Sequence, residues 1–216
     1  MPRMMRIDRL AFAAICILSA SALGCGSDAG PGNLEPTSSA SGGSPAGEDL
    51  PRMALQPEDL PSQFGGTQRD GSLNLEGESS TGSSAAYRRM FTSESADVQP
   101  GTASCVETSL SLYARPEAAH SVLAESLNEA ASASGLSPIE EADVGEESAG
   151  FTFVAGNEVC NLGIADRGSA ISVVSRSGQV ISTVLLVALE GDASADEAVN
   201  LARKQAQRVE AVLTES

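Results

Sequence analysis

The chain has 216 residues, with 29 acidic and 13 basic side chains and a formal net charge of −16 at pH 7. So acidic a chain repels nucleic acid and anionic lipid, which excludes partners that are held by a basic patch. Tryptophan is absent and aromatic residues make up 3% of the chain, so a surface of stacked rings for sugars or single-stranded nucleic acid is not expected. The length suits one folded domain.

The first 24 residues have the layout of a secretory signal peptide. Arg3, Arg6 and Arg9 form a basic head, residues 10–18 are almost wholly apolar, and small residues follow up to Cys25. Even when it is extended to residue 23, the apolar run has about 14 residues, whereas a helix that spans a bilayer needs ~20. The chain is therefore expected to be exported, and an uncleaved membrane anchor is the weaker alternative.

Two cleavage sites compete at the end of this signal. The residues Ala22-Leu23-Gly24-Cys25 resemble the lipobox of bacterial lipoproteins, with alanine and leucine in swapped order. The resemblance implies that the Cys25 thiol receives a diacylglyceryl group and that lipid on Cys25 holds the chain on the membrane, facing outside the cytoplasm. The alternative is Ala20-Ser21-Ala22, a small-x-small site at which ordinary signal peptidase would release an unanchored protein.

The four cysteines favour the lipoprotein interpretation. Cys16 leaves with the signal peptide, and if Cys25 is lipidated then Cys105 and Cys160 are left to form a disulfide. Their loop of about 55 residues gives roughly 4 kcal/mol of stabilisation in the chain-entropy model. No Cys-x-x-Cys motif is present, so a structural bond is favoured over a redox-active one.

Residues 25–50 are rich in glycine, serine and proline and are predicted to be a flexible tether. A coil of about 25 residues has a root-mean-square span of roughly 25–30 Å. A single domain is predicted over residues 51–216. Near its start, the Asp-Leu-Pro-x-x-Phe arrangement at residues 59–64 resembles the opening of bacterial surface lipoproteins and of related sensor-type extracellular domains.

The first half of this domain is predicted to contain few regular elements. Residues 53–64 are expected to be a short extended segment, residues 65–85 a loop or frayed strand, and residues 86–91 a strand or helix turn. Period-two alternation predicts a strand at residues 105–113, with Glu107, Ser109 and Ser111 on one face. Pro116 suits the first position of a helix that is predicted over residues 117–133.

The second half is predicted to be a meander followed by a helix. The four expected strands are residues 151–155, 158–166, 170–176 and 179–189. The last of them is apolar on both faces, which is typical of a central strand. Ser194 and Glu197 match a capping box that starts a helix over residues 194–213. The predicted fold is α+β, an antiparallel sheet made of this four-stranded meander and one or more N-terminal strands, with two packed helices.

Few residues suggest catalysis or metal binding. His120 is the one histidine, and a Gly-x-Ser-x-Gly elbow is absent, so a histidine on a helix surface is favoured over a catalytic base. An acidic run offers oxygen ligands for calcium, but it lacks the EF-hand spacing, so a solvated loop is favoured. The run consists of Glu140, Glu141, Asp143, Glu146 and Glu147. No catalytic residue, metal ligand or cofactor is predicted.

Two functions from different classes remain. The favoured hypothesis is a non-enzymatic, membrane-anchored binding, sensing or accessory domain for an unknown small molecule or protein. The alternative is an exported hydrolase that uses His120 or unrecognised carboxylates, or else a structural surface protein. Geometry separates them, because an enzyme should place His120 or an acid pair in a concave pocket with a perturbed pKa.

Overall fold

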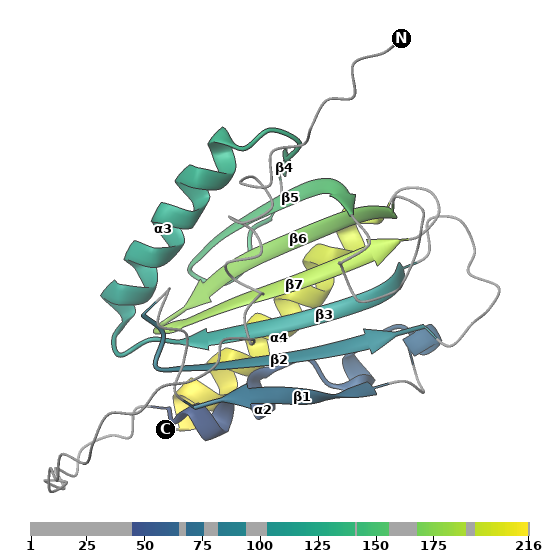
Figure 1. The fold of residues 1–216 in the computed structure, drawn as a ribbon. Helices are drawn as coiled ribbons and strands as arrows, with labels where there is room; N and C mark the ends of the chain where they lie inside the picture. The colour runs from purple at the N-terminus through teal and green to yellow at the C-terminus, as the bar shows by residue number, and fades with distance from the viewer. Residues whose placement is uncertain are drawn as a thin grey trace, which may run out of the picture.

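The computed structural model describes residues 45–64, 68–75, 82–93, 103–140, 142–155, 168–188 and 193–215. In these residues one seven-stranded antiparallel sheet has the order β1-β2-β3-β7-β6-β5-β4 (Figure 1). The strands are β1 (Gln68–Asn74), β2 (Ala85–Thr92), β3 (Ala103–Leu112), β4 (Ser137–Ile139), β5 (Glu147–Ala155), β6 (Gly168–Ser177) and β7 (Val180–Ala188). The α+β class is confirmed, and β7 is the middle strand, as its two apolar faces predicted.

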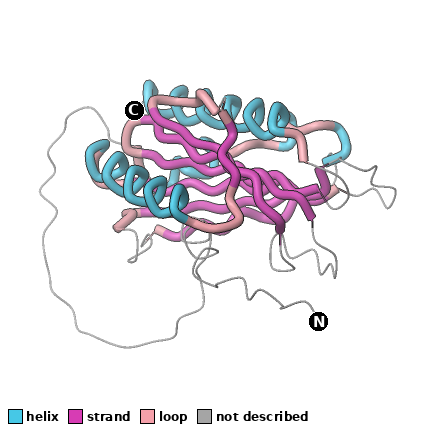
Figure 2. The backbone as a smooth tube through the Cα atoms, turned by 90° about the horizontal axis from the view of Figure 1, so that it is seen from above, coloured by secondary structure: helices cyan, strands magenta, loops and turns pink. Residues whose placement is uncertain are grey.

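The two long helices lie on opposite faces of the sheet (Figure 2). Helix α4 (Ala195–Glu215) packs on the face to which the even-numbered residues of β3 point, since Val106 and Leu110 share apolar clusters with it. Helix α3 (Pro116–Ser132) lies on the other face. The sheet is therefore the middle layer of three, which explains why the middle strand, β7, has apolar residues on both faces.

Helix α4 begins where the sequence predicts. The Ser194 hydroxyl accepts a hydrogen bond from the Glu197 amide at 3.3 Å, which satisfies one of the unpaired N–H groups of the first turn. The buried face of α4 contains eight residues: Ala198, Val199, Leu201, Ala202, Gln205, Ala206, Val209 and Val212. Within the described residues, no helix has the length and apolar character needed to cross a membrane.

Helix α3 covers a smaller area of its face. Pro116 occupies the first turn, as predicted, and the chain leaves the helix through Gly135, whose φ of +93° favours glycine. Of its 17 residues only Ala119, Leu123 and Ala130 are fully buried. Ala119 and Leu123 belong to a separate apolar cluster that also contains Val174 and Ile181 of the sheet. The rest of this face is not covered by α3.

The predicted meander is wrong in one respect. Residues 158–166 were expected to form a strand between the two strands on either side of them. Instead β5 pairs directly with β6, from Glu147 opposite Arg176 to Ala155 opposite Gly168. Residues 156–167 lie outside the described part of the chain. The short strand β4, which was not predicted, pairs with the middle of β5 on its other side.

The N-terminal segment, residues 45–64, is helical rather than extended. It contains α2 (Leu50–Met53) and three 3-10 turns, η1 (Gly47–Asp49), η2 (Pro57–Asp59) and η3 (Ser62–Phe64). An aspartate closes two of the turns, because Asp49 accepts from the Ala46 amide at 3.0 Å and Asp59 accepts from the Gln56 amide at 2.8 Å. Pro51 in the first turn of α2 and Pro57 in the first turn of η2 favour the start of these two elements. The first described element, η1, therefore lies inside the predicted tether.

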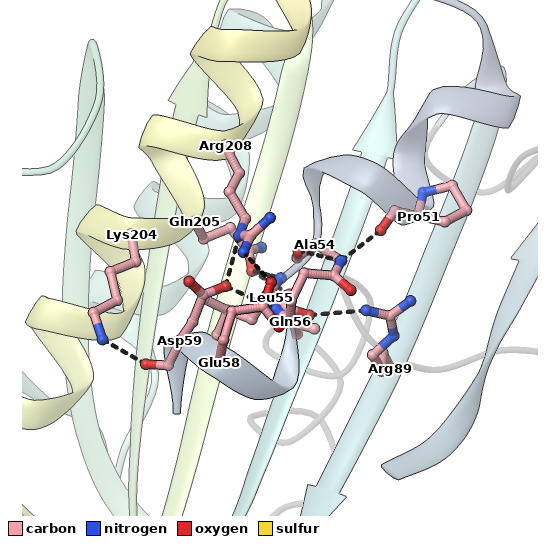
Figure 3. A network of polar contacts seen from close by, with 11 residues as sticks. Pro51, Ala54, Leu55, Gln56, Glu58, Asp59, Arg89, Lys204, Gln205 and Arg208 are labelled. Carbon is pink, nitrogen blue, oxygen red and sulfur yellow. Dashed lines mark hydrogen bonds and ion pairs between the residues drawn. The ribbon is translucent and has the colours of Figure 1, made fainter. Parts of the chain in front are cut away.

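A polar network fixes this segment to α4 (Figure 3). The Arg208 guanidinium contacts Asp59 at 2.6 Å and Glu58 at 2.9 Å, and Lys204 donates to the Asp59 carbonyl at 2.5 Å. The buried Gln205 amide oxygen accepts from the Leu55 amide at 3.3 Å. The basic residues of α4 therefore hold the N-terminal segment, in addition to any favourable effect on the helix dipole.

Candidate functional site

Polar side chains gather on the face of the sheet that α3 only partly covers. Because side chains alternate along a strand, Glu107, Ser109 and Ser111 of β3 all point away from α4. Their neighbours across the strands are also polar, since Arg88 of β2 and Thr183 of β7 both lie opposite Ser109. We call these five residues, Arg88, Glu107, Ser109, Ser111 and Thr183, the polar patch.

An ion pair lies at the centre of the polar patch. The Arg88 guanidinium contacts one carboxylate oxygen of Glu107, Oε2, at 2.5 Å. The Glu107 side chain is only 3% exposed, whereas the Arg88 side chain is 44% exposed. Burial raises the pKa of Glu107, and the hydrogen bond and charge of Arg88 act in the opposite direction. A carboxylate in the middle of a sheet is costly to bury, so its presence requires a reason.

The hydroxyl residues of the patch are largely buried. Ser109, Ser111 and Thr183 are at most 7% exposed. Neither their hydroxyls nor the carboxylate oxygens of Glu107 are among the buried side-chain atoms that have no hydrogen-bond partner in the described part of the chain. Each of these polar groups is therefore either hydrogen-bonded or in contact with solvent.

Apolar side chains border the patch on two sides. Ile181 lies opposite Ser111 and Val174 lies opposite Thr183, and both are packed under α3. In the other direction Met90 and Leu185 lie opposite Glu107 and belong to a second apolar cluster. The patch is thus a polar band between two apolar areas on one face of the sheet. It lies next to α3, which has few fully buried residues.

The candidate base His120 lies in a different place. It is on the surface of α3 with its side chain 58% exposed, and its Nδ1–H donates to both Glu147 oxygens, at 2.8 and 2.9 Å. Glu147 also accepts from Arg176 at 2.7 Å, and that hydrogen bond is the main cause of its lowered pKa. His120 therefore belongs to a surface ion-pair cluster that joins α3 to the sheet, which supports the helix-surface prediction over a catalytic base.

A cavity of about 350 Å³ lies at the outer edge of the sheet. Its lining includes Glu140, Asp143, Glu146 and Glu147 from the acidic run, together with apolar groups of β4 and β5. Glu141 lies outside the described residues. Arg176 binds both Glu146 and Glu147 at 2.7 Å, so half of these carboxylates already have a cation. No group of three metal-binding side chains occurs in the described part of the chain.

The comparisons with known proteins support the fold. No protein-family model and no curated protein matches this sequence. Among solved structures, the chain is similar to the extracellular domain of PknH from Mycobacterium tuberculosis. The TM-score is 0.55, and the match covers 79% of this chain and 100% of that domain, at 11% sequence identity. At so low an identity, the similarity shows a common fold.

The structure leaves most of the predicted modification sites untested. Cys25 and Cys160 lie outside the described residues, so the lipid anchor and the disulfide remain predictions. Cys105 is fully buried on β3 and points to the same face as Glu107, two residues away. If the predicted Cys105–Cys160 bond forms, it lies next to the polar patch.

The polar patch was missed by the sequence reasoning. The alternation along β3 correctly placed Glu107, Ser109 and Ser111 on one face, but it did not show that this face is buried. Residues 86–91 were correctly expected to pack as structure, but Arg88 was not linked to Glu107. One available signal was a single acid flanked by small hydroxyl residues in a strand that otherwise reads as central.

Proposed function

We propose that this chain is a lipid-anchored, extracytoplasmic domain that binds a small molecule without catalysis, as a sensing or accessory module. The observation that carries the proposal is the polar patch, in which the Arg88–Glu107 ion pair and three hydroxyls gather on the sheet face that α3 only partly covers. These donors and acceptors could form hydrogen bonds to a polar molecule.

Other observations agree with this assignment. The fold is shared with a domain described as extracellular, and the signal-peptide layout with Cys25 suits export and anchoring. Helix α3 packs on the same face through the buried Ala119 and Leu123 and the partly buried Ala118, Val122 and Leu127, so it lies beside the patch. The hydrolase alternative is weakened, because His120 is exposed and bound to Glu147.

Native mass spectrometry of the full chain tests the proposal. The protein is purified in mild detergent from its own cells and compared with the same chain after unfolding, dialysis and refolding. We expect a fraction of the native sample to carry an additional small-molecule mass that the refolded sample lacks. A native sample with only the mass of the chain and its lipid, at every detergent concentration, would contradict a small-molecule binding function.

A further inference from the structure

We infer that His120 makes the docking of helix α3 on the sheet depend on pH, and that α3 is held more firmly when this imidazole is protonated. The inference goes beyond the proposed binding function and does not depend on it. It is drawn from two features of the structure, namely the few buried side chains that hold α3 and the charges that surround His120.

Helix α3 is held on the sheet by few buried side chains. Ala119 and Leu123 are its fully buried residues in the apolar cluster beneath it, and its other residues in that cluster are partly buried. The buried face of α4, on the opposite side of the sheet, contains eight residues. Elements with few buried apolar contacts open most readily. A polar contact of modest strength can therefore change how often α3 leaves the sheet.

His120 provides such a contact between α3 and the sheet. Its Nδ1 lies 2.8 and 2.9 Å from the two carboxylate oxygens of Glu147 on β5. Arg176 of β6 contacts both Glu146 and Glu147 at 2.7 Å. With a neutral imidazole, the two carboxylates and the one guanidinium leave this cluster with one negative charge in excess. Protonation of His120 removes that excess, and it makes both partners of the His120–Glu147 hydrogen bond ionised, which strengthens it.

The other ionisable groups near this contact do not cancel the effect. Strand β7, which also packs under α3, has no ionisable side chain. Tyr113, in the same apolar cluster, is a phenol, a group that ordinarily titrates at about pH 10. Arg115 and Glu117 at the start of α3 are both exposed, and their charges are opposite. His120 lies past the first turn of α3, where the helix dipole has little effect on an imidazolium.

The charge of the contact changes through His120 rather than through Glu147. The hydrogen bond from Arg176 is the main cause that lowers the pKa of Glu147, so this carboxylate stays ionised where histidines ordinarily titrate, at about pH 6.5. The protonated imidazole is the form that pairs better with the carboxylate. The docking of α3 should therefore be firmest below that range of pH and should weaken as the pH rises through it.

Amide hydrogen exchange of the full chain in mild detergent, followed by mass spectrometry of peptides from α3 and α4, provides the test. Rates are measured at about pH 5.5 and about pH 8, on either side of the ordinary titration of histidine, and corrected for the intrinsic effect of pH on exchange. Helix α4 is the internal reference, because a change in global stability affects both helices. We expect the protection of α3 relative to α4 to be about twofold to fivefold greater at the lower pH. An equal ratio at the two pH values, or a greater one at the higher pH, would overturn the inference.

Two variants assign the effect to its residue. His120→Gln keeps a hydrogen-bond donor for Glu147 but cannot be charged, and because the His120 side chain is 58% exposed the variant should fold normally. It should lose the pH dependence of α3 protection. Glu125→Gln is the matched control, since it removes a charge from another exposed residue of α3 and should keep the dependence of the wild type. A His120→Gln chain that keeps the full dependence, or a Glu125→Gln chain that loses it, would assign the effect to another group and overturn the inference.

Discussion

Replacing Gln205 with leucine should lower the free energy of unfolding, because the change leaves several buried hydrogen-bonding groups without a partner. Gln205 is fully buried on α4, and its amide oxygen accepts from the Leu55 amide and from the Thr108 hydroxyl. Its amide nitrogen donates to the Ser109 carbonyl at 3.5 Å. The one side chain thus joins the N-terminal segment, α4 and the central strand β3.

The cost of Gln205→Leu follows from the groups that it leaves unpaired. Each buried donor or acceptor that loses its partner costs about 1–3 kcal/mol, and leucine regains part of this by burying apolar surface. We expect a net loss of about 2–3 kcal/mol in the free energy of unfolding. This corresponds to a melting temperature about 4–12 °C lower for a domain of this size.

Urea denaturation followed by far-ultraviolet circular dichroism measures this loss, since the chain has no tryptophan. A second variant, Thr108→Val with Gln205→Leu, removes both partners of one hydrogen bond. It should be more stable than the sum of the single changes predicts, by about 1 kcal/mol or more. A loss below about 0.5 kcal/mol for Gln205→Leu, or strict additivity in the double variant, would refute the reasoning.

Three further changes test other parts of the structure. A Cβ at Gly71 would lie 1.8 Å from the Tyr87 hydroxyl, so Gly71→Ala should lower the free energy of unfolding by about 1–3 kcal/mol, and an unchanged urea midpoint would contradict this packing. Because the pKa of Glu107 is raised above its usual 4.5, the folded chain keeps a proton that the unfolded chain has lost, and stability should fall as pH rises through that interval. Glu107→Gln should flatten this part of the pH–stability profile, and an identical slope in both proteins would count against it. Cys25→Ser should move the protein from the membrane to the soluble exported fraction, whereas retention in the membrane would argue against the lipid anchor.

Local patterns predicted those elements whose signals lie within a single segment. The capping serine and the spacing of alanines defined α4, and Pro116 together with Gly135 bounded α3. The two-sided apolar character of β7 placed it at the centre of the sheet. These features depend on helix capping and burial, which neighbouring residues largely decide.

The remaining features depend on contacts between distant segments. The turns of the N-terminal segment are stabilised by α4, about 150 residues later in the chain. The pairing of β5 with β6 joins strands on either side of residues 156–167, and the alternating pattern of a single segment does not show which strands will be neighbours. The polar patch forms only when β2, β3 and β7 align in one register, and no single strand contains enough of it to be recognised.

The docking of the N-terminal segment on α4 determines how tension on the tether would reach the domain. Arg52 pairs with Glu215 at 2.7 Å, so the start of the described chain lies beside the end of the last helix. A pull from the N-terminal side would load this pair first and then the contacts of Arg208 with Asp59 and Glu58. These contacts lie on the opposite face of the sheet from the polar patch. Mechanical strain would therefore detach the N-terminal segment before it could distort Glu107 and its neighbours.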